Sequence, residues 1–317
     1  MTMIQPVRPM SRVQRRALLK SQYFRMPRAD ALDAALADAV EDFDAGNLTG
    51  RHFEAMGLVV IGESGSGKTT EINEALRRFA ADPRPLECGL DRRFVQLALV
   101  GETTWKALGL ELLKQLGFEV SARRTEHEIW SRVRTQLKGQ GIWLIHIDEC
   151  QHMFQTLGNN EVRKVLNALK TFMKHRDWPM VLILSGIPEL LKKVNLDPQF
   201  QRLMTPVHMA PIDPASTDLD EIDTAFCGLA RAVGVDISAV RNEDTYLRLS
   251  YACLDVYGRV FRFLVDLLSV LPDGRTELTL DDLIDRYAFR TGCMPGQNVF
   301  LREDYQECTA GLLMAEP

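Results

Sequence analysis

The sequence predicts an α/β fold, a parallel sheet flanked by helices, followed by a small all-helical domain. Apolar runs alternate with helical segments between residues 57 and about 209. Strands that are apolar on both faces and separated by helices are typical of a parallel sheet covered on both sides. From residue 219 to about 290 the pattern is helical, without a convincing strand. With 317 residues, 46% of them apolar, the chain is long enough for both parts.

The first 50 residues are predicted to form an N-terminal basic arm and a helix. Residues 1–28 carry seven basic side chains and no acid, whereas residues 29–50 carry six acids and no base. The stretch RADALDAALADAVEDFDAG has apolar residues at helical spacing and ends at Gly46, so we expect a helix there. The basic arm leaves two interpretations open: a solvated arm, or one that docks on nucleic acid or a partner protein.

The α/β domain is expected to occupy residues 51–212. Its strands are the apolar runs LVVIG, FVQLALV, IWLIHID and MVLILSG, at residues 58–62, 94–100, 142–148 and 180–186, with a short further run, PVHM, at 206–209. Helices are expected between them at about 69–79, 103–117, 127–141 and 160–176. Open α/β sheets place their sites at the carboxyl ends of the strands. Polar residues at those ends are therefore the first candidates for a site.

The helical domain is expected to cover residues 213–290, and residues 291–317 form a C-terminal tail. Pro211 and Pro214 mark the boundary with the α/β domain. Helices are expected at 219–234, 243–258, 259–271 and 278–290. The tail matches no motif.

Composition excludes several classes of protein. The six cysteines are widely and irregularly spaced, without a C-x-x-C pair, which favours neither a disulfide framework nor a zinc knuckle and fits a reducing cytoplasm. No stretch reaches the roughly 18 uninterrupted apolar residues of a membrane span, so we expect a cytoplasmic protein without a membrane partner. A net charge of −5 argues against a general affinity for polyanions.

A glycine-rich loop joins the first predicted strand to the helix after it. GESGSGKT, residues 62–69, matches G-x-x-x-x-G-K-[ST] without a departure, in the strand–loop–helix context that the motif requires. In such a loop backbone N–H groups and the helix N-terminus surround phosphate oxygens, the lysine reaches the β- and γ-phosphates, and the threonine ligates Mg²⁺. The loop therefore predicts ATP with Mg²⁺, held by Gly62, Glu63, Ser64, Gly65, Ser66, Gly67, Lys68, Thr69 and Thr70.

Polar residues end the third and fourth predicted strands. Asp148 is expected to complete the Mg²⁺ shell and Glu149 to polarise the attacking water, a pairing that kinases without a water-activating Glu lack. Ser185 is interpreted either as a sensor that positions this water or as a turn-capping residue. His146, Cys150 and His152 flank the acids, but His146 lies inside a strand and no second ligand pair has zinc spacing, so zinc is not expected.

Arginines elsewhere are candidates for the remaining positive charge at the γ-phosphate. Arg202 lies after a helix and before a short apolar strand, a position from which an oligomeric ATPase projects an arginine finger into the site of the next subunit. The alternative for Arg202 is a plain surface arginine. Arg259 and Arg262, at the start of a helix, are candidates for a second sensor that reaches the nucleotide, or both are simply solvated.

With these motifs in order, the chain resembles the AAA+ ATPases of Tn7-like transposons, the TniB/TnsC family of transposition regulators. The segments that carry the resemblance are GESGSGKTT, WLIHIDECQHMF, LILSGIPELL and QFQRLMTPVHM, and the resemblance covers about residues 58–209. The loop and the Asp–Glu pair are shared by many ATPases, and the specificity lies in the last two segments. One departure is Ile187, where some relatives carry Thr, and it weakens the sensor assignment of Ser185.

The resemblance implies a P-loop ATPase that binds double-stranded DNA as an ATP-dependent ring or helical filament. It implies that the chain links a TniQ-like targeting protein to a TnsB/TniA-like transposase, whose contact stimulates hydrolysis and disassembly, as in CRISPR-associated or other transposons. The family's DNA contacts fall here on Lys106 and Thr125, with Arg123 and Arg124 adjacent. A polar, basic break between helices at that place agrees with contacts to phosphates.

Two other functions stay open from the sequence. One is an AAA+ ATPase of a secretion-type or other assembly system, which usually adds a membrane span or periplasmic domain. The other is an interaction module gated by nucleotide, with vestigial hydrolysis. Lys68, Asp148 and Glu149 are all present, which favours hydrolysis over the second alternative.

Overall fold

The computed structural model describes residues 10–310, and these divide into two compact units. The core unit is residues 27–210, and the helical unit combines residues 10–26 with residues 211–310. This division differs from the sequence-based boundaries, which place residues 1–50 together as one N-terminal segment. The chain crosses between the units at Met26–Pro27 and again at Ala210–Pro211.

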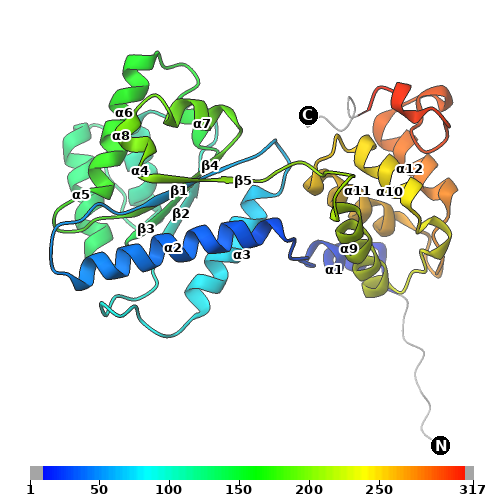
Figure 1. The fold of residues 1–317 in the computed structure, drawn as a ribbon, viewed down its shortest axis with the longest axis horizontal. Helices are drawn as coiled ribbons and strands as arrows, with labels where there is room; N and C mark the ends of the chain where they lie inside the picture. Colours follow the sequence, from blue (N-terminus) through cyan, green and yellow to red (C-terminus); the bar gives the residue numbers. More distant parts are fainter. Residues whose placement is uncertain (1–9, 311–317) are drawn as a thin grey trace, which may run out of the picture. The chain divides into compact units, whose positions relative to one another are not determined.

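The core unit contains a five-stranded sheet in the order β2-β3-β4-β1-β5, and every neighbouring pair is parallel (Figure 1). The predicted parallel α/β fold is confirmed. The strands are β1 (Gly57–Ile61), β2 (Phe94–Ala98), β3 (Leu144–Asp148), β4 (Val181–Gly186) and β5 (Met204–His208). Because all five run the same way, the sheet has one carboxyl edge, where the strands end, and one amino edge, where they begin.

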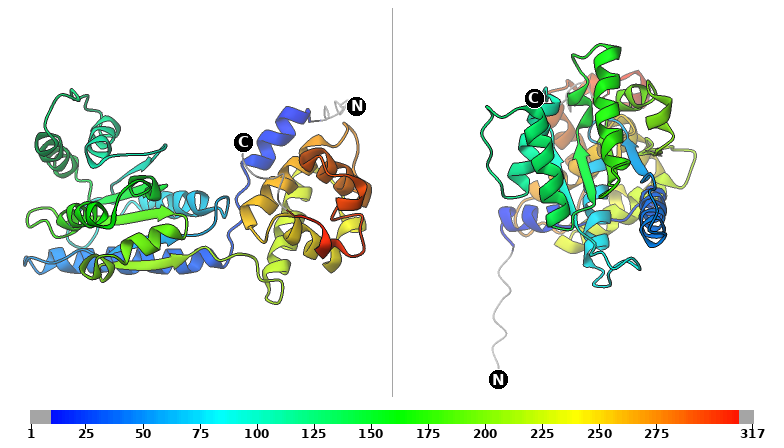
Figure 2. Two further views of the ribbon diagram at one scale, coloured as in Figure 1. Left: turned by 90° about the horizontal axis from the view of Figure 1, so that it is seen from above. Right: turned by 90° about the vertical axis from the view of Figure 1, so that its left-hand side faces the viewer.

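Helices cover both faces of this sheet (Figure 2). They are α2 (Arg28–Leu48), α3 (Lys68–Ala81), α4 (Trp105–Gln115), α5 (Glu126–Gly139), α6 (Asn159–Met173), α7 (Glu189–Val194) and α8 (Pro198–Gln201), and a 3₁₀ turn η1 (Cys150–Met153) follows β3. Alternate residues of β1 point to opposite faces. Leu58 and Val60 pack with α2 and α3, whereas Val59 and Ile61 pack with α4, α5 and α6.

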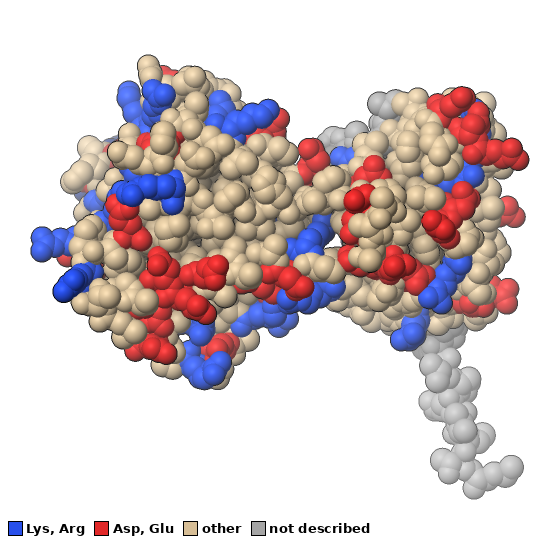
Figure 3. Space-filling view, viewed as in Figure 1, with Lys and Arg blue, Asp and Glu red and all other residues tan. Residues whose placement is uncertain are grey.

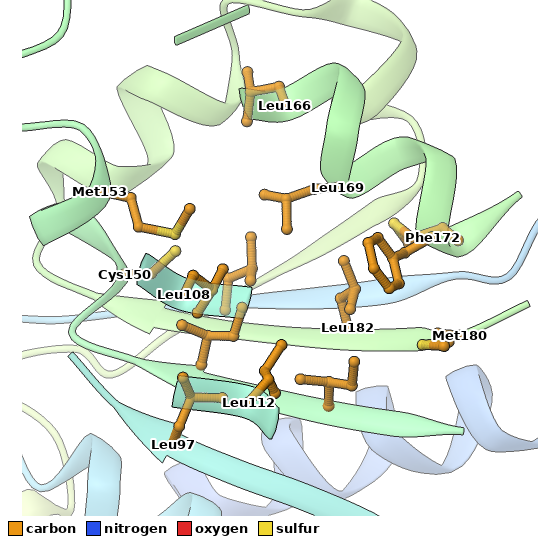
Figure 4. Close-up of a cluster of buried hydrophobic side chains, with 14 of the residues drawn as sticks. Leu97, Leu108, Leu112, Cys150, Met153, Leu166, Leu169, Phe172, Met180 and Leu182 are labelled. Carbon is orange, nitrogen blue, oxygen red and sulfur yellow. The ribbon is translucent and has the colours of Figure 1, made fainter. Parts of the chain in front are cut away.

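The second of these faces shows how the apolar pattern builds the core. Leu166, Leu169 and Phe172, at helical spacing along α6, share one apolar cluster with Leu182 of β4 and with Met180, the residue before that strand (Figure 4). All five are at most 4% exposed. Burying such side chains contributes about 1.5–3 kcal/mol each, so this helix is fixed to the sheet by its apolar side.

Helices α4 and α5 run side by side in the same direction. Trp105 at the start of α4 stacks on Trp130 near the start of α5, with ring centroids 4.0 Å apart. At the other end Gln140, which caps α5, donates to the carbonyl of Leu116, which caps α4, at 3.0 Å. Residues 117–125 therefore return along the pair, and the two helix N-termini lie at the same end.

The helical unit is built around α9 (Asp218–Val233), α10 (Glu243–Ala252), α11 (Tyr257–Val270) and α12 (Leu280–Thr291), with the 3₁₀ turns η2 (Ser238–Val240), η3 (Pro295–Gln297) and η4 (Tyr305–Glu307). An isolated bridge joins Asp236 and Glu277. The predicted helix over 243–258 ends at Ala252, because the Ser250 carbonyl and hydroxyl both bond to Asp255, which has a left-handed φ of 55°.

Part of the basic arm belongs to this helical unit. Residues 12–20 form helix α1 (Arg12–Lys20), whose Leu19 lies in the apolar core of the unit. Arg15 is buried and donates to the Leu271 carbonyl at 2.6 Å, and Arg16 pairs with Asp266 at 2.9 Å. These two cations are therefore used within the unit, whereas Arg12 and Lys20 of α1 are exposed, and for them both interpretations of the arm stay open. Residues 1–9, which include Arg8, lie outside the described part of the chain.

The predicted tail is also part of this fold as far as Ala310. Val299, Phe300 and Tyr305 are buried in the same apolar core. Among residues 10–310, no helix has the length and apolar character required to cross a bilayer.

Candidate nucleotide site

The glycine-rich loop has the backbone geometry that its sequence requires. Gly65 and Gly67 take left-handed φ values of 79° and 95°, a region that favours glycine. At Gly62 a Cβ would lie 2.8 Å from the Met209 Cβ and 2.9 Å from the Met209 carbonyl oxygen. The loop therefore turns tightly against the residue that follows β5 and then enters α3, whose first residue is Lys68.

Lys68 lies across this loop in a buried position. The residue is only 4% exposed, and its Nζ donates to the carbonyls of Gly62 at 2.8 Å and Glu63 at 3.0 Å. Burial lowers the pKa of Lys68, and the carboxylates of Glu149 and Asp148 oppose this shift only in part. The ammonium is thus held within the curve of the loop, close to both predicted catalytic acids.

Thr69 and Asp148 meet across the carboxyl edge. The Thr69 hydroxyl donates to Asp148 Oδ2 at 2.7 Å, although 79 residues separate the two. A hydroxyl and a carboxylate are the hard oxygen ligands that Mg²⁺ prefers. The two predicted metal ligands are therefore adjacent, and their chemistry fits Mg²⁺.

Ser185, which His146 contacts in turn, holds the other oxygen of Asp148. Ser185 donates to Asp148 Oδ1 at 2.5 Å, and its hydroxyl lies 2.8 Å from His146 Nε2. Both residues are fully buried. Burial raises the pKa of Asp148, but the hydrogen bonds from Ser185 and Thr69 outweigh it and leave the pKa below its ordinary value. In this geometry Ser185 positions Asp148; the predicted contact with the attacking water stays a prediction.

The two histidines and Cys150 near these acids differ in burial and in hydrogen bonding. Burial lowers the pKa of His146 to about 4, so the ring is neutral at pH 7 and serves as a hydrogen-bonding partner of Ser185. Cys150 is fully buried, which raises the pKa of its thiol to about 12. His152 bonds to the Gln155 side chain at 3.1 Å.

Glu149 is held by a neighbour that the sequence analysis missed. Gln151 donates from Nε2 to Glu149 Oε2 at 2.5 Å, and its Oε1 accepts from the backbone N–H of Ile187 at 3.4 Å. Glu149 itself has a left-handed φ of 53°, which is uncommon for a residue with a side chain. A Cβ on Gly186 would lie 2.3 Å from Gln151 Oε1. Gln151 therefore links the predicted base to the end of β4, and its place two residues after Glu149 was the only sequence signal.

A second missed residue is Arg28, which the sequence analysis counted in the basic arm. It is the first residue of α2, and its Nη2 donates to the Ser66 carbonyl at 2.7 Å. A Cβ on Gly67 would lie 3.0 Å from the same nitrogen. Arg28 therefore supports the glycine-rich loop from outside, a contact that no local pattern indicates.

Arg202 lies at the opposite edge of the sheet. It follows α8 and precedes β5, so it stands at the amino edge, whereas Lys68 and Asp148 stand at the carboxyl edge. Its Nη2 pairs with Glu54 Oε2 at 2.6 Å, and 59% of its side-chain surface is exposed. Arg202 is therefore a surface residue of the core unit, turned away from the nucleotide site of its own chain.

The predicted DNA contacts gather at one end of the α4/α5 pair. Lys106 is in the first turn of α4, and Thr125 is the N-cap of α5, with its hydroxyl accepting from the Glu128 N–H. Arg123 and Arg124 are exposed in the turn before Thr125, and Arg124 pairs with Glu128 at 3.1 Å. This end therefore combines two helix N-termini and three cations with the acidic side chains of Glu126 and Glu128 in the first turn of α5. The predicted contact with DNA stays a prediction.

The two candidate second-sensor arginines belong to the helical unit. Arg259 and Arg262 lie in the first two turns of α11; Arg259 is half-buried and Arg262 exposed. Their predicted reach to the nucleotide stays a prediction.

Comparison with known proteins fits this geometry. Residues 51–194 match a protein-family model described as an AAA domain. No curated protein matches the chain.

Solved structures extend the likeness beyond the AAA domain. Cdc6p from Pyrobaculum aerophilum is similar at 17% identity, with a TM-score of 0.57 over 85% of this chain and 69% of the other. The Aeropyrum pernix ORC2 protein in ADPNP–ADP complexes is similar at 15% identity, with a TM-score of 0.59 over 86% and 71%. The ORC1 protein of the same organism, solved in complex with DNA, is similar at 15% identity, with a TM-score of 0.60 over 87% of this chain and 69% of the other. At these identities the likeness shows the fold, an AAA+ P-loop core followed by a helical region.

Proposed function

We propose that this chain binds and hydrolyses ATP with Mg²⁺, in a site completed by a second copy of itself. The observation that carries the proposal is the cluster at the carboxyl edge. Lys68 lies within the glycine-rich loop, Thr69 bonds directly to Asp148, and Glu149 follows Asp148 in the chain. An acid held for the metal, a second acid for the water and a lysine for the phosphates are the parts that P-loop hydrolysis needs.

Each residue has a separate task in this proposal. The loop N–H groups and Lys68 bind the β- and γ-phosphates, and Thr69 and Asp148 hold Mg²⁺, which neutralises phosphate charge when bound. Ser185 keeps Asp148 ionised and oriented. Glu149, oriented by Gln151, takes up the proton of the attacking water. The ORC2 protein of A. pernix forms complexes with ADP and ADPNP, which supports a nucleotide ligand here.

The sheet geometry supports a shared site. A five-residue strand is roughly 16 Å long at about 3.3 Å per residue, and Arg202 stands at the far end of that length from Lys68 and Asp148. An arginine so placed serves the nucleotide of a neighbouring copy, as a finger in trans. We therefore propose a ring or helical filament of identical chains.

DNA is the proposed scaffold for this assembly. The end of the α4/α5 pair offers Lys106, Arg123 and Arg124 together with the N-cap Thr125. On the face in Figure 3, acidic and basic side chains are interspersed in each unit. A few cations per copy, repeated along an assembly, therefore provide the contacts to duplex DNA. The similar ORC1 protein of A. pernix is solved in complex with DNA.

The role we propose for the assembled protein is regulation of DNA transposition, as a target selector that a targeting protein loads and a transposase contacts. Its support is the resemblance of residues 58–209 to the TniB/TnsC family, above all in LILSGIPELL and QFQRLMTPVHM. Hydrolysis would then release the chain from DNA.

Electron microscopy with duplex DNA and a non-hydrolysable ATP analogue tests the proposal, together with phosphate release with and without DNA. We expect DNA-threaded rings or filaments, and hydrolysis that DNA changes. Monomers without bound DNA would contradict the DNA-scaffolded assembly. If the protein assembles on DNA but binds no transposase or targeting protein, the proposed ATPase activity stands and the proposed role in transposition is wrong.

A further inference from the structure

Three charged side chains meet at the amino edge of the sheet. Glu54 lies just before β1, Lys174 caps the end of α6, and Arg202 caps the end of α8. Lys174 Nζ donates to Glu54 Oε1, and Arg202 Nη2 donates to Glu54 Oε2 at 2.6 Å. The hydrogen bond from Lys174 is the main cause that lowers the pKa of Glu54. One carboxylate is thus shared between two cations.

The backbone around this cluster is fixed. The N–H of Ala55 bonds to the Met173 carbonyl at 3.0 Å, and that of Gly57 bonds to the Leu203 carbonyl at 2.8 Å. The short helix before Arg202 is capped by Asp197, which also pairs with Lys170 at 3.1 Å. Of the charged groups, therefore, only the side chains have freedom to move, and Glu54 is the carboxylate that the Arg202 guanidinium contacts.

We propose that Glu54 is a positioning residue for Arg202: it orients the guanidinium towards the nucleotide of a neighbouring copy, while Lys174 offsets its negative charge. This inference rests on the proposed function, in which Arg202 acts in trans. Glu54 touches neither the nucleotide nor the water. It acts by reducing the freedom of a long, flexible side chain before the two copies meet.

The exposure of this ion pair distinguishes a role in orienting Arg202 from a role in keeping Arg202 away from the nucleotide. The Arg202 side chain is 59% exposed and that of Glu54 35%, and ion pairs of this kind contribute little because water and salt screen them. Such a pair is too weak to withhold Arg202 from a triphosphate. The contact uses one terminal nitrogen, and the guanidinium has further N–H donors in a fixed fork for phosphate oxygens.

Mixing two inactive variants tests the inference. Glu149→Gln keeps Arg202 but lacks the base, and Arg202→Ala keeps the base but lacks the finger. Each alone is expected to be nearly inactive with duplex DNA, and a mixture is expected to recover phosphate release, because one variant supplies the arginine and the other the rest of the site.

Glu54 is then changed only in the variant that supplies the arginine. Adding Glu54→Ala to Glu149→Gln is expected to lower the maximal rate of the mixture about three- to tenfold at unchanged KM for ATP, because ATP is bound by the other copy. Glu54→Gln, which keeps an oxygen acceptor, is expected to restore part of the rate. Glu74→Ala is the matched control: Glu74 also pairs with an arginine, Arg77, at 2.8 Å, but on the surface of α3.

The outcomes separate the two proposals. A mixture that recovers nothing, without any change at Glu54, overturns the site in trans and the inference with it. Recovery that Glu54→Ala leaves unchanged, or raises, overturns the positioning role alone. If Glu74→Ala lowers the rate of the mixture as much as Glu54→Ala does, the positioning role is also overturned. The same holds if Glu54→Gln fails to restore the rate and the Glu54 variants have a reduced melting temperature, because the loss is then a structural defect.

Discussion

The two edges of the sheet carry charged residues in contrasting surroundings. At the carboxyl edge Lys68, Asp148 and Ser185 are each at most 4% exposed and are held by direct hydrogen bonds to one another or to the glycine-rich loop. At the amino edge Arg202 is a surface residue held by one exposed ion pair. The carboxyl edge is thus a buried cluster fixed by its own hydrogen bonds. The amino edge at Arg202 is an exposed surface.

The two parts of the proposed site are thus separated by the length of one strand. Both edges belong to the same five strands, so a parallel fold alone separates the residues proposed to bind and hydrolyse ATP from the arginine that is proposed to assist them. Changes at the carboxyl edge should therefore act within one chain, and changes at the amino edge should act only between chains.

The largest effect should follow from removing the base at the carboxyl edge. Glu149→Gln removes the proton acceptor, so we expect hydrolysis to fall about 10²- to 10⁴-fold with ATP binding retained and DNA-bound assemblies prolonged. Phosphate release, nucleotide binding and electron microscopy check the three parts. Normal turnover in this variant would contradict the assignment of Glu149 and with it the chemical role of this edge.

The next effect should come from the amino edge. Arg202→Ala is expected to lower DNA-dependent hydrolysis about 10²- to 10³-fold, with ATP affinity per chain unchanged because the arginine belongs to a neighbour's site. Equilibrium binding of a fluorescent ATP analogue at low protein concentration measures the second part. Arg77→Ala, an exposed arginine of α3, is the control. If isolated chains of Arg202→Ala lose ATP binding, Arg202 also serves the nucleotide site of its own chain, and the two edges do not act separately.

A smaller effect is expected where Gln151 holds Glu149. Gln151→Ala frees the carboxylate of the base, and we expect the maximal rate to fall roughly tenfold at constant KM. Gly186→Ala should act in the same direction, since its Cβ would displace the Gln151 oxygen. A higher basal rate in either variant would mean that Gln151 restrains the base, contrary to the role given to it here.

The smallest change concerns DNA. Replacing both Arg123 and Arg124 by alanine should weaken duplex binding and reduce the dependence of log K on log salt by about one for each phosphate that is no longer neutralised. Salt titration by fluorescence anisotropy measures this slope. Replacing Arg84 and Arg93, which are exposed and paired with nearby acids, changes the net charge equally and is the control. Equal effects of both pairs would remove the specific DNA role of the α4/α5 end.

The sequence was informative where contacts follow from local pattern or from strand direction. The loop at residues 62–69 is contiguous, and the meeting of Thr69 with Asp148 follows from the rule that parallel strands end at one edge. The apolar runs predicted the strands to within a few residues, since β1, β3 and β4 are buried on both faces.

The remaining contacts depend on packing that no local pattern encodes. Glu54 and Arg202 are 148 residues apart, and Arg28 reaches the loop from the start of α2. Helix α1 looked like a free basic arm because its charges were visible in the sequence and their partners in α11 and the loop after it were not. Long side chains with distant partners are therefore where sequence analysis fell short.

Hydrolysis measured across a dilution series, with duplex DNA in excess, tests the central claim most directly. If the site is shared between copies, the rate per chain should approach zero at low concentration and rise to a plateau as chains assemble, and Arg202→Ala should stay low throughout. A rate per chain that is constant down to concentrations at which the protein is monomeric would contradict the account.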